Sequence, residues 1–160
     1  MFKIESYISP TTIEFENTRE PNRFTRDELL NWTFGVRISF TDNESGQSLL
    51  LLPDASLFQV LHGLATVTGQ LLAGNKDAAT NILDREGGYN LWIKITGDAV
   101  EVSELFSAQR FVTDSKDFID ATALFLPMAI DHAKKAFPKL EYNKDFLGIE
   151  SEIMNRLGLR

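Results

Sequence analysis

The sequence predicts an α+β domain: an antiparallel sheet with two long helices and a C-terminal amphipathic helix, packed mainly on one face. Apolar and polar residues alternate between Trp32 and Phe40, which is the period of a strand with one buried face. Apolar residues recur every three or four positions after residues 54, 114 and 143, as in amphipathic helices. Turn clusters join the strand-like runs, as in antiparallel hairpins.

The N-terminal part of the chain carries weaker signals. Residues 2–8 and 12–16 predict two short strands, and Pro10 between them marks a turn. Residues 17–31 are polar and predict a loop with one helical turn near residues 26–30. We expect this part to lie at the periphery of the fold.

The strand at 32–40 is the first half of a predicted hairpin. A turn cluster at 42–46 returns the chain into a strand at 48–52. The run from Leu49 to Leu52 has no alternation, so we expect both faces of this strand to be covered.

A long helix follows, capped by Asp54 or Ser56 and ended by the Gly74-Asn75 step. Its interior contains Gly63 and Gly69, each of which costs about 1 kcal/mol relative to alanine. Close seating of the helix on the sheet would offset this cost, and close approach of a second chain is the alternative.

The next segment, residues 76–86, is ambiguous, with a short helix at 78–83 as one interpretation. Beyond Gly87 and Gly88 the alternation predicts a three-strand meander. Its strands are expected at residues 89–95, 99–106 and 110–113.

Two helices complete the predicted fold. Asp114 caps the first, which runs toward Phe137 and which Pro127 should kink or divide. The second spans about residues 143–157. In one interpretation its apolar side covers the core, and in the other it docks a partner.

The chain of 160 residues fits one domain, which should bury roughly 70% of the surface that the unfolded chain exposes. We expect residues 1–31 to form peripheral strands and a loop, 32–137 the core, and 143–157 the C-terminal helix. The absence of cysteine excludes disulfides and thiolate sites. The longest strictly aliphatic run has four residues, and no charged leader precedes an apolar stretch, so we expect a cytoplasmic protein that does not enter the membrane.

The net charge of −7 is unevenly distributed along the chain. Residues 1–106 hold 15 acidic against 8 basic residues, whereas residues 107–160 hold 8 of each. A negative field repels nucleic acid and anionic lipid, and it speeds the encounter with a basic protein. We therefore expect a protein partner and no nucleic acid.

Acidic turns are the candidate partner-binding sites. We expect them to carry the contact through Asp42, Glu44, Asp84, Glu86, Asp98, Glu101 and Glu104. For the last three, the alternative is a solvated hairpin edge that resists pairing with other strands. On a regular strand Glu101 and Glu104 would point to opposite faces, so they do not form a catalytic acid–base pair.

No catalytic constellation accompanies these acids, and we expect no catalytic residue, cofactor or metal. The sequence contains no nucleophile elbow, dinucleotide fingerprint or phosphate loop. We expect structural or surface roles for His62 and His132, with His62 facing solvent. Asp114, Asp117 and Asp120 favour helix capping, with a divalent-cation site as the alternative.

A family resemblance rests on the run from Phe111 to Asp114, leading into Phe118 and then residues 123–125. Together with the order of the elements over residues 32–136, it resembles the small immunity proteins of bacterial polymorphic toxin systems, particularly the wall-associated-protein type. The resemblance implies a cytoplasmic protein that binds and neutralises a cognate toxin, often a nuclease. It implies no particular site residue, and the N-terminal 30 and last 20 residues lie outside it.

Three functions follow as hypotheses. The first is a non-catalytic inhibitor that neutralises a basic toxin by steric and electrostatic occlusion. The second is a secretion-chaperone-like homodimer that holds an unfolded effector segment. The third is a divalent-cation-dependent enzyme that uses Asp114, Asp117 and Asp120.

Overall fold

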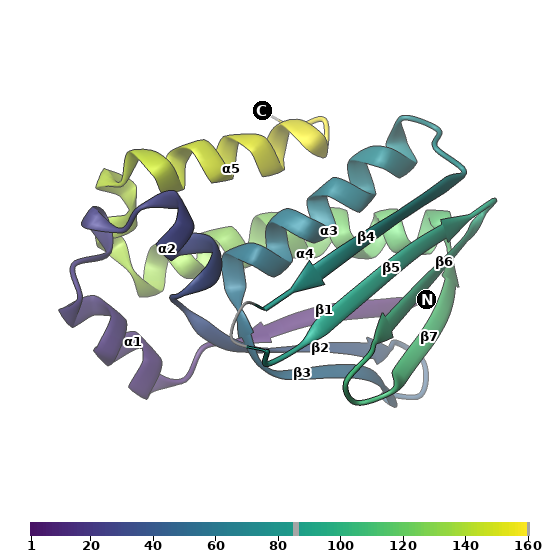
Figure 1. Cartoon of the computed structure of the whole chain (residues 1–160), viewed down its shortest axis with the longest axis horizontal. Helices are drawn as coiled ribbons and strands as arrows, with labels where there is room; N and C mark the ends of the chain where they lie inside the picture. The colour runs from purple at the N-terminus through teal and green to yellow at the C-terminus, as the bar shows by residue number, and fades with distance from the viewer. Residues whose placement is uncertain (85–86, 160) are drawn as a thin grey trace.

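The computed structural model describes residues 1–84 and 87–159, and it confirms the α+β class. In these residues one antiparallel sheet has the strand order β1-β2-β3 and the other the order β4-β5-β6-β7 (Figure 1). The strands are β1 (Phe2–Tyr7), β2 (Gly35–Asp42), β3 (Ser48–Ser56), β4 (Asp77–Leu83), β5 (Asn90–Thr96), β6 (Ala99–Glu104) and β7 (Gln109–Asp114). The helices are α1 (Pro10–Thr18), α2 (Arg26–Asn31), α3 (Leu57–Leu72), α4 (Ser115–Ala136) and α5 (Lys144–Arg156), with short 3-10 helices η1 (Pro21–Arg23) and η2 (Pro138–Tyr142).

Helices α3 and α4 form the centre of the molecule. They pack against each other, α4 runs along β1, and α3 lies against β4 (Figure 1). The two sheets approach each other at β3 and β7, where one side chain replaces a strand pairing: Gln109 accepts from the Leu51 N–H at 2.7 Å and donates to the Leu51 carbonyl at 3.0 Å. Helix α5 covers α3 on the side away from the three-stranded sheet.

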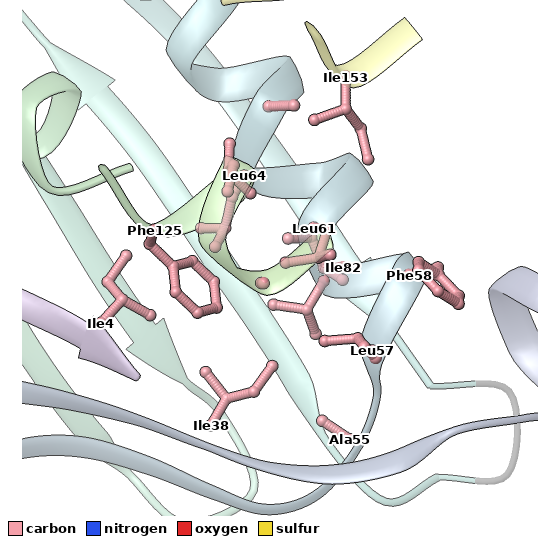
Figure 2. Close-up of a cluster of buried hydrophobic side chains, with 14 of the residues drawn as sticks. Ile4, Ile38, Ala55, Leu57, Phe58, Leu61, Leu64, Ile82, Phe125 and Ile153 are labelled. Atoms are coloured by element: carbon pink, nitrogen blue, oxygen red, sulfur yellow. The ribbon is translucent and has the colours of Figure 1, made fainter. Parts of the chain in front are cut away.

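The core is one continuous cluster of apolar side chains from both sheets and from α3, α4 and α5. Phe125 of α4 lies between Ile4 of β1 and Leu64 of α3 (Figure 2). Gly63 allows α3 to approach β4, because an added Cβ would lie 2.2 Å from the Ile82 Cδ1 atom. The expected close seating of this helix on a sheet is therefore confirmed at Gly63.

The strand predicted at residues 12–16 is wrong, because these residues belong to α1. The Ser9 hydroxyl caps the helix by accepting from the Thr12 N–H at 3.1 Å, and Pro10 occupies the first helical turn. Proline suits that position since its missing N–H would have no partner there. The helical turn expected near residues 26–30 is confirmed as α2, and Thr25 and Glu28 form its capping box.

The short helix considered at residues 78–83 is also wrong. This segment is β4, which pairs with β5 from Asp77 opposite Thr96 to Leu83 opposite Asn90. The predicted three-strand meander is present, but β4 extends it to a four-stranded sheet.

The other element boundaries differ less. Strand β2 begins at Gly35 and β3 continues to Ser56, so Asp54 lies in a strand and does not cap α3. Helix α4 contains Pro127 and is not divided by it. Among the described residues, no helix combines the length and the apolar character needed to cross a bilayer.

Candidate functional site

A small cavity lies where α1, α2, β2, β3 and the segment after β4 converge. Its volume is about 120 Å³. It is lined by Glu16, Asn31, Trp32, Thr33, Gly35, Asp54, Ser56 and Asp84. Three of these side chains are carboxylates from distant parts of the sequence, so the fold gathers negative charge at one polar hollow.

Glu16 is the buried carboxylate of this cavity. Its oxygens accept weak contacts from the Arg19 guanidinium and, at 3.4 Å, from the Phe34 N–H. Burial raises the pKa of Glu16, and the Arg19 charge and the Phe34 N–H only partly oppose that rise. A second cation in the cavity would therefore stabilise the ionised form.

Asp54 reaches the cavity because its neighbour on β2 has no side chain. A Cβ on Gly35 would lie 2.8 Å from the Asp54 Oδ1 atom. The preceding residue, Phe34, has a φ of 57°, which turns the chain from the end of α2 into β2. No Lys, Arg or His of the described residues lies within ion-pair distance of Asp54.

Trp32 is one of the residues that line the cavity, and it is 43% exposed. Its indole N–H donates to Asp27 at 2.9 Å, and Asn31 donates to the other Asp27 oxygen at 3.0 Å. Gln59 ties this wall to the four-stranded sheet by donating to Asn31 at 3.0 Å and to the Leu83 carbonyl at 2.8 Å. The indole is therefore held in place before any ligand arrives.

The donor set of the cavity suits an organic cation better than a bare metal ion. Within residues 1–84 and 87–159, no three His, Asp or Glu side chains converge closely enough to hold a metal. A guanidinium or ammonium group carries several N–H donors that can reach separate carboxylates. An aromatic face such as that of Trp32 adds a cation–π contact.

A second hollow of about 270 Å³ adjoins the cavity and shares Gly35 and Asp54 with it. It contains Arg37, whose guanidinium lies 5.0 Å from the centre of the Tyr7 ring. The two hollows form a polar groove that is acidic at the Glu16 end and basic at the Arg37 end. We call this pair of hollows the polar groove.

Only Asp84, among the acids predicted to bind a partner, lines this groove. Glu86 lies outside the described residues. Asp42 is the last residue of β2, and Glu44 lies in the turn that follows it. The Asp42 carboxylate accepts from the Ser45 N–H at 2.8 Å and from the Ser45 hydroxyl at 2.7 Å. These hydrogen bonds hold the pKa of Asp42 below its usual range.

The acids of the β5–β6 hairpin also form local contacts. Asp98 pairs with Lys76, and Glu101 pairs with Arg110 at 3.0 Å. Each pair lowers the pKa of its carboxylate, chiefly through the hydrogen bond from the cation. The structure does not bring these acids together with Asp42, Glu44 or Asp84 in one cavity.

Glu104 is buried and is not a surface acid, in contrast to the exposed position that the sequence predicts. It is 4% exposed and points to the inner side of β6, opposite to Glu101. Its carboxylate accepts from the backbone N–H groups of Asn90 at 3.0 Å, Phe106 at 3.1 Å and Ser107 at 2.6 Å, and from the Ser107 hydroxyl. It therefore holds the β6–β7 turn and has no lone pair directed at solvent.

The three aspartates around the start of α4 are separated by their partners. Asp114 caps the helix by accepting from the Asp117 N–H at 2.8 Å, as the capping interpretation predicts. Asp117 lies 3.4 Å from the N-terminal amine, and Asp120 pairs with Lys116 at 2.6 Å. They do not form a metal-binding group.

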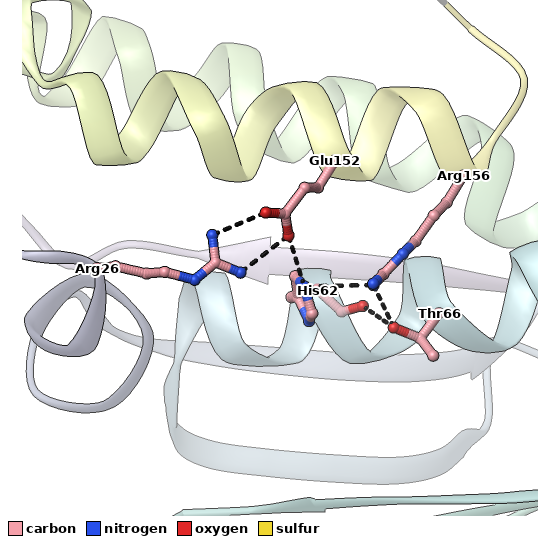
Figure 3. Close-up of polar contacts among 5 residues, drawn as sticks. All are labelled: Arg26, His62, Thr66, Glu152 and Arg156. Carbon is pink, nitrogen blue, oxygen red and sulfur yellow. Dashed lines mark hydrogen bonds and ion pairs between the residues drawn. The ribbon is translucent and has the colours of Figure 1, made fainter.

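His62 is not solvent-facing, in contrast to the prediction. It lies between α3 and α5, where its Nε2 atom is 3.1 Å from Glu152 and 3.3 Å from Arg156 (Figure 3). Arg26 of α2 donates two hydrogen bonds of 2.9 Å to the same Glu152, and Arg156 also contacts Thr66. We call these five residues the α5 clamp, because they join α2 and α3 to the last helix.

The α5 clamp predicts a dependence of stability on pH. Burial lowers the pKa of His62, and the positive charge of Arg156 adds to that effect although Glu152 opposes it. The folded chain therefore favours the neutral imidazole, and its stability should fall as pH drops below about 6.5, the usual pKa of histidine. We expect the stability of the His62→Gln variant to fall less than that of the parent protein over the same pH range. The free energy of unfolding in denaturant, measured at a series of pH values, tests this.

The matched control is His132→Gln, which removes the other histidine from an exposed position on α4. In this variant the free energy of unfolding should fall with decreasing pH as steeply as in the parent protein. If the free energy of unfolding of His62→Gln fell with decreasing pH as steeply as that of the parent protein, the assignment of this pH dependence to the α5 clamp would be contradicted.

Sequence reasoning missed Glu16, Trp32 and Asp54 as site residues. The sequence pattern predicts a strand at Glu16, places Trp32 at the start of the alternating run that ends at Phe40, and offers Asp54 as a helix cap. Their one local signal is Gly35, the small residue inside an otherwise regular strand pattern, which marks the close approach of another group.

Comparisons with known proteins add no family or homologue. No protein-family model, no curated protein and no solved structure matches the chain.

Proposed function

We propose that the chain is a non-catalytic binding protein that captures a basic protein partner in the polar groove. A lysine or arginine side chain of the partner enters the cavity and pairs with Glu16, Asp54 and Asp84 beside the Trp32 indole. The observation that carries the proposal is the convergence of three carboxylates, from distant parts of the sequence, on one polar hollow. No acid–base pair or nucleophile of the described residues is needed for this role.

The charge distribution supports a macromolecular cation as the partner. The acidic excess lies in residues 1–106, which also supply every carboxylate of the cavity. Long-range attraction would speed the encounter, and the cavity would select the final orientation. The biological role that we propose is that of a cytoplasmic immunity protein, which neutralises a basic toxin by occluding its surface.

Fluorescence of Trp32 tests the cavity directly. The parent for this experiment carries Trp92→Phe, so that Trp32 is the only indole. Titration with an oligo-arginine peptide should change its emission. Asp54→Asn should weaken the peptide's affinity at least about tenfold, since hydrogen bonds to charged groups contribute about 1.5–3 kcal/mol.

The control is Asp42→Asn, which removes the same charge from the end of β2, outside the polar groove. This variant should change the affinity by less than about twofold in physiological salt, because separated surface charges are largely screened. Equal losses in both variants would indicate binding to the overall negative field and would contradict a specific cavity.

The biological role requires a separate test. If the neighbouring reading frame encodes a basic toxin domain, cells that express this domain should grow only when the chain is co-expressed. Glu16→Gln combined with Asp54→Asn should abolish this protection, whereas Asp42→Asn should keep it. Protection that survives the double variant would contradict the cavity as the toxin-binding site.

A secretion-chaperone-like homodimer is the second candidate, and the exposed apolar residues Leu124 and Met128 on α4 favour it. A chaperone of this kind should slow the aggregation of an unfolded probe such as reduced, carboxymethylated lactalbumin. Loss of that effect in Leu124→Glu would support it. No effect of the parent protein on the probe would exclude it.

A further inference from the structure

Strand β1 has an unpaired edge. It is the first strand in the order β1-β2-β3, and it pairs with β2 from Phe2 opposite Asp42 to Tyr7 opposite Arg37. The same register continues to the hydrogen bond from the Asn43 N–H to the Met1 carbonyl, at 3.1 Å.

Hydrogen-bonded pairs alternate along an antiparallel ladder. Because Met1 forms such a pair, the other odd residues of β1 also direct their backbone groups toward β2. The N–H and C=O groups of Phe2, Ile4 and Ser6 therefore point away from β2, toward the free edge. No other segment within residues 1–84 and 87–159 pairs with them.

The sequence of this edge is self-complementary in one register. A second β1 strand, running antiparallel, forms hydrogen bonds only if even residues lie opposite even residues. Centring the pair on Ile4 places Lys3 opposite Glu5 of the other copy, twice. Shifting the centre to residue 3 or residue 5 would instead oppose Lys3 to Lys3 or Glu5 to Glu5, which is unfavourable.

A hollow surrounds the edge of β1 on both sides. Its volume is about 320 Å³, and it extends from Tyr7 and Ser39 on the outer face of the sheet to Phe125 and Met128 on α4. On α4, Met128 is 61% exposed, and Leu124, one turn earlier, is 67% exposed. A strand placed along β1 would lie beneath these two side chains and would cover them.

Helix α4 runs in the same direction as β1, since Asp117 lies near Met1 and Phe125 lies beside Ile4 (Figure 2). A twofold axis at Ile4 would therefore place the two α4 helices antiparallel, with their Leu124 and Met128 side chains in contact. The acidic start of each helix, at Asp117, would face the end of the other helix that carries Lys135. The same twofold axis at Ile4 therefore pairs β1 with its copy and brings α4 into contact with its copy.

We propose that the free edge of β1 and the Leu124–Met128 face of α4 form a homodimer interface, in which two β1 strands pair antiparallel about Ile4 into a six-stranded sheet. Exposed edges are commonly protected by single charges that prevent pairing. Here the two charges have opposite signs and lie two residues apart, so they disfavour other registers and favour this one. The inference does not rest on the acidic cavity, because Lys3, Glu5, Leu124 and Met128 line neither hollow of the polar groove. The hollow beside β1 does share Tyr7 and Arg37 with the basic end of that groove.

Sedimentation of the full chain over a concentration series tests the dimer. Lys3→Glu or Glu5→Lys should each weaken dimerisation about tenfold, because two cross-strand attractions become two repulsions. Both changes together should restore it. Thermal unfolding of each variant at low concentration shows whether the monomer is intact, since the exposed Lys3–Glu5 ion pair adds little to its stability.

Cross-linking determines the register, and the chain contains no natural cysteine to interfere. A mixture of Lys3→Cys and Glu5→Cys proteins should form a disulfide-linked dimer under mild oxidation, because these positions are directly opposite in the proposed pair. Each variant alone should cross-link poorly. Efficient cross-linking of Lys3→Cys with itself would overturn the register.

The helix face has its own matched control. Leu124→Glu should dissociate the dimer, whereas Leu105→Glu, which changes an exposed leucine of the β6–β7 turn, should not. A chain that stays monomeric at every concentration overturns the proposal. So does a dimer that responds neither to the charge changes nor to Leu124→Glu, because it would use another surface.

Discussion

Replacing Phe34 by alanine is expected to lower the free energy of unfolding by about 3–5 kcal/mol, the usual cost of removing a buried phenylalanine. The Phe34 ring is fully buried at the centre of an aromatic group. Its centroid lies 5.7 Å from that of Phe24, 5.3 Å from that of Phe58 and 4.6 Å from that of Phe137. The substitution would remove all three contacts and leave a cavity between α2, α3 and the end of α4.

The loss of unfolding free energy in Phe34→Ala can be assigned to the ring and not to the backbone. Phe34 has a positive φ, which is as unfavourable for alanine as for phenylalanine, so the lost free energy reports side-chain packing. Phe106→Ala is the matched control, because it removes an exposed phenylalanine from a turn. Denaturant unfolding should show almost no change there, and a loss below about 1 kcal/mol in Phe34→Ala would contradict the central role of this ring.

The elements that the sequence predicts well are those whose signal is local. Helix α3 and the strand β2 have unbroken apolar periodicity over most of their length, and the core-facing residues follow it. Helix α4 is predicted from its Asp114 cap and its periodic apolar residues. In these segments the buried face gives the apolar residues a helical or strand period that can be recognised from the local sequence alone.

The elements that the sequence mispredicts depend on distant contacts or on a single capping residue. Strand β4 is short and mostly polar, and it is a strand because β5 pairs along its full length and Ile82 fills the space beside Gly63. Helix α1 has little apolar periodicity to identify it. There, the Ser9 cap and the helix-starting role of Pro10 outweigh the strand-like alternation of the following residues.

The polar groove is harder still to predict. Its carboxylates stand at positions 16, 54 and 84, and only the fold brings them together. Counting charges identifies an acidic region but gives equal weight to every exposed turn. The structure distinguishes acids that already serve a cap or an ion pair, such as Asp42 and Glu101, from Asp54, which has no cationic partner among the described residues.

Replacing Glu104 by alanine is expected to cost about 3 kcal/mol of folding free energy, because three backbone N–H groups would lose a charged acceptor. Glu101→Ala is the matched control on the same strand. Its carboxylate faces the opposite side and pairs with Arg110 at the surface, where solvent screens the ion pair, so its loss should cost far less than the loss of Glu104. Denaturant unfolding at neutral pH measures both values.

Lowering the pH should weaken the stabilising contribution of the Glu104 carboxylate in the parent protein. Burial opposes ionisation of Glu104, but the hydrogen bonds from Ser107, Asn90 and Phe106 outweigh it and lower the pKa. A carboxylate with a lowered pKa stabilises the fold above its ordinary pKa and loses that contribution as pH falls through the folded value. The stability difference between parent and Glu104→Ala should therefore shrink in acid. If the difference is small at neutral pH and binding of a basic partner is lost instead, then Glu104 acts at the surface, and the placement of this side chain inside the turn is wrong.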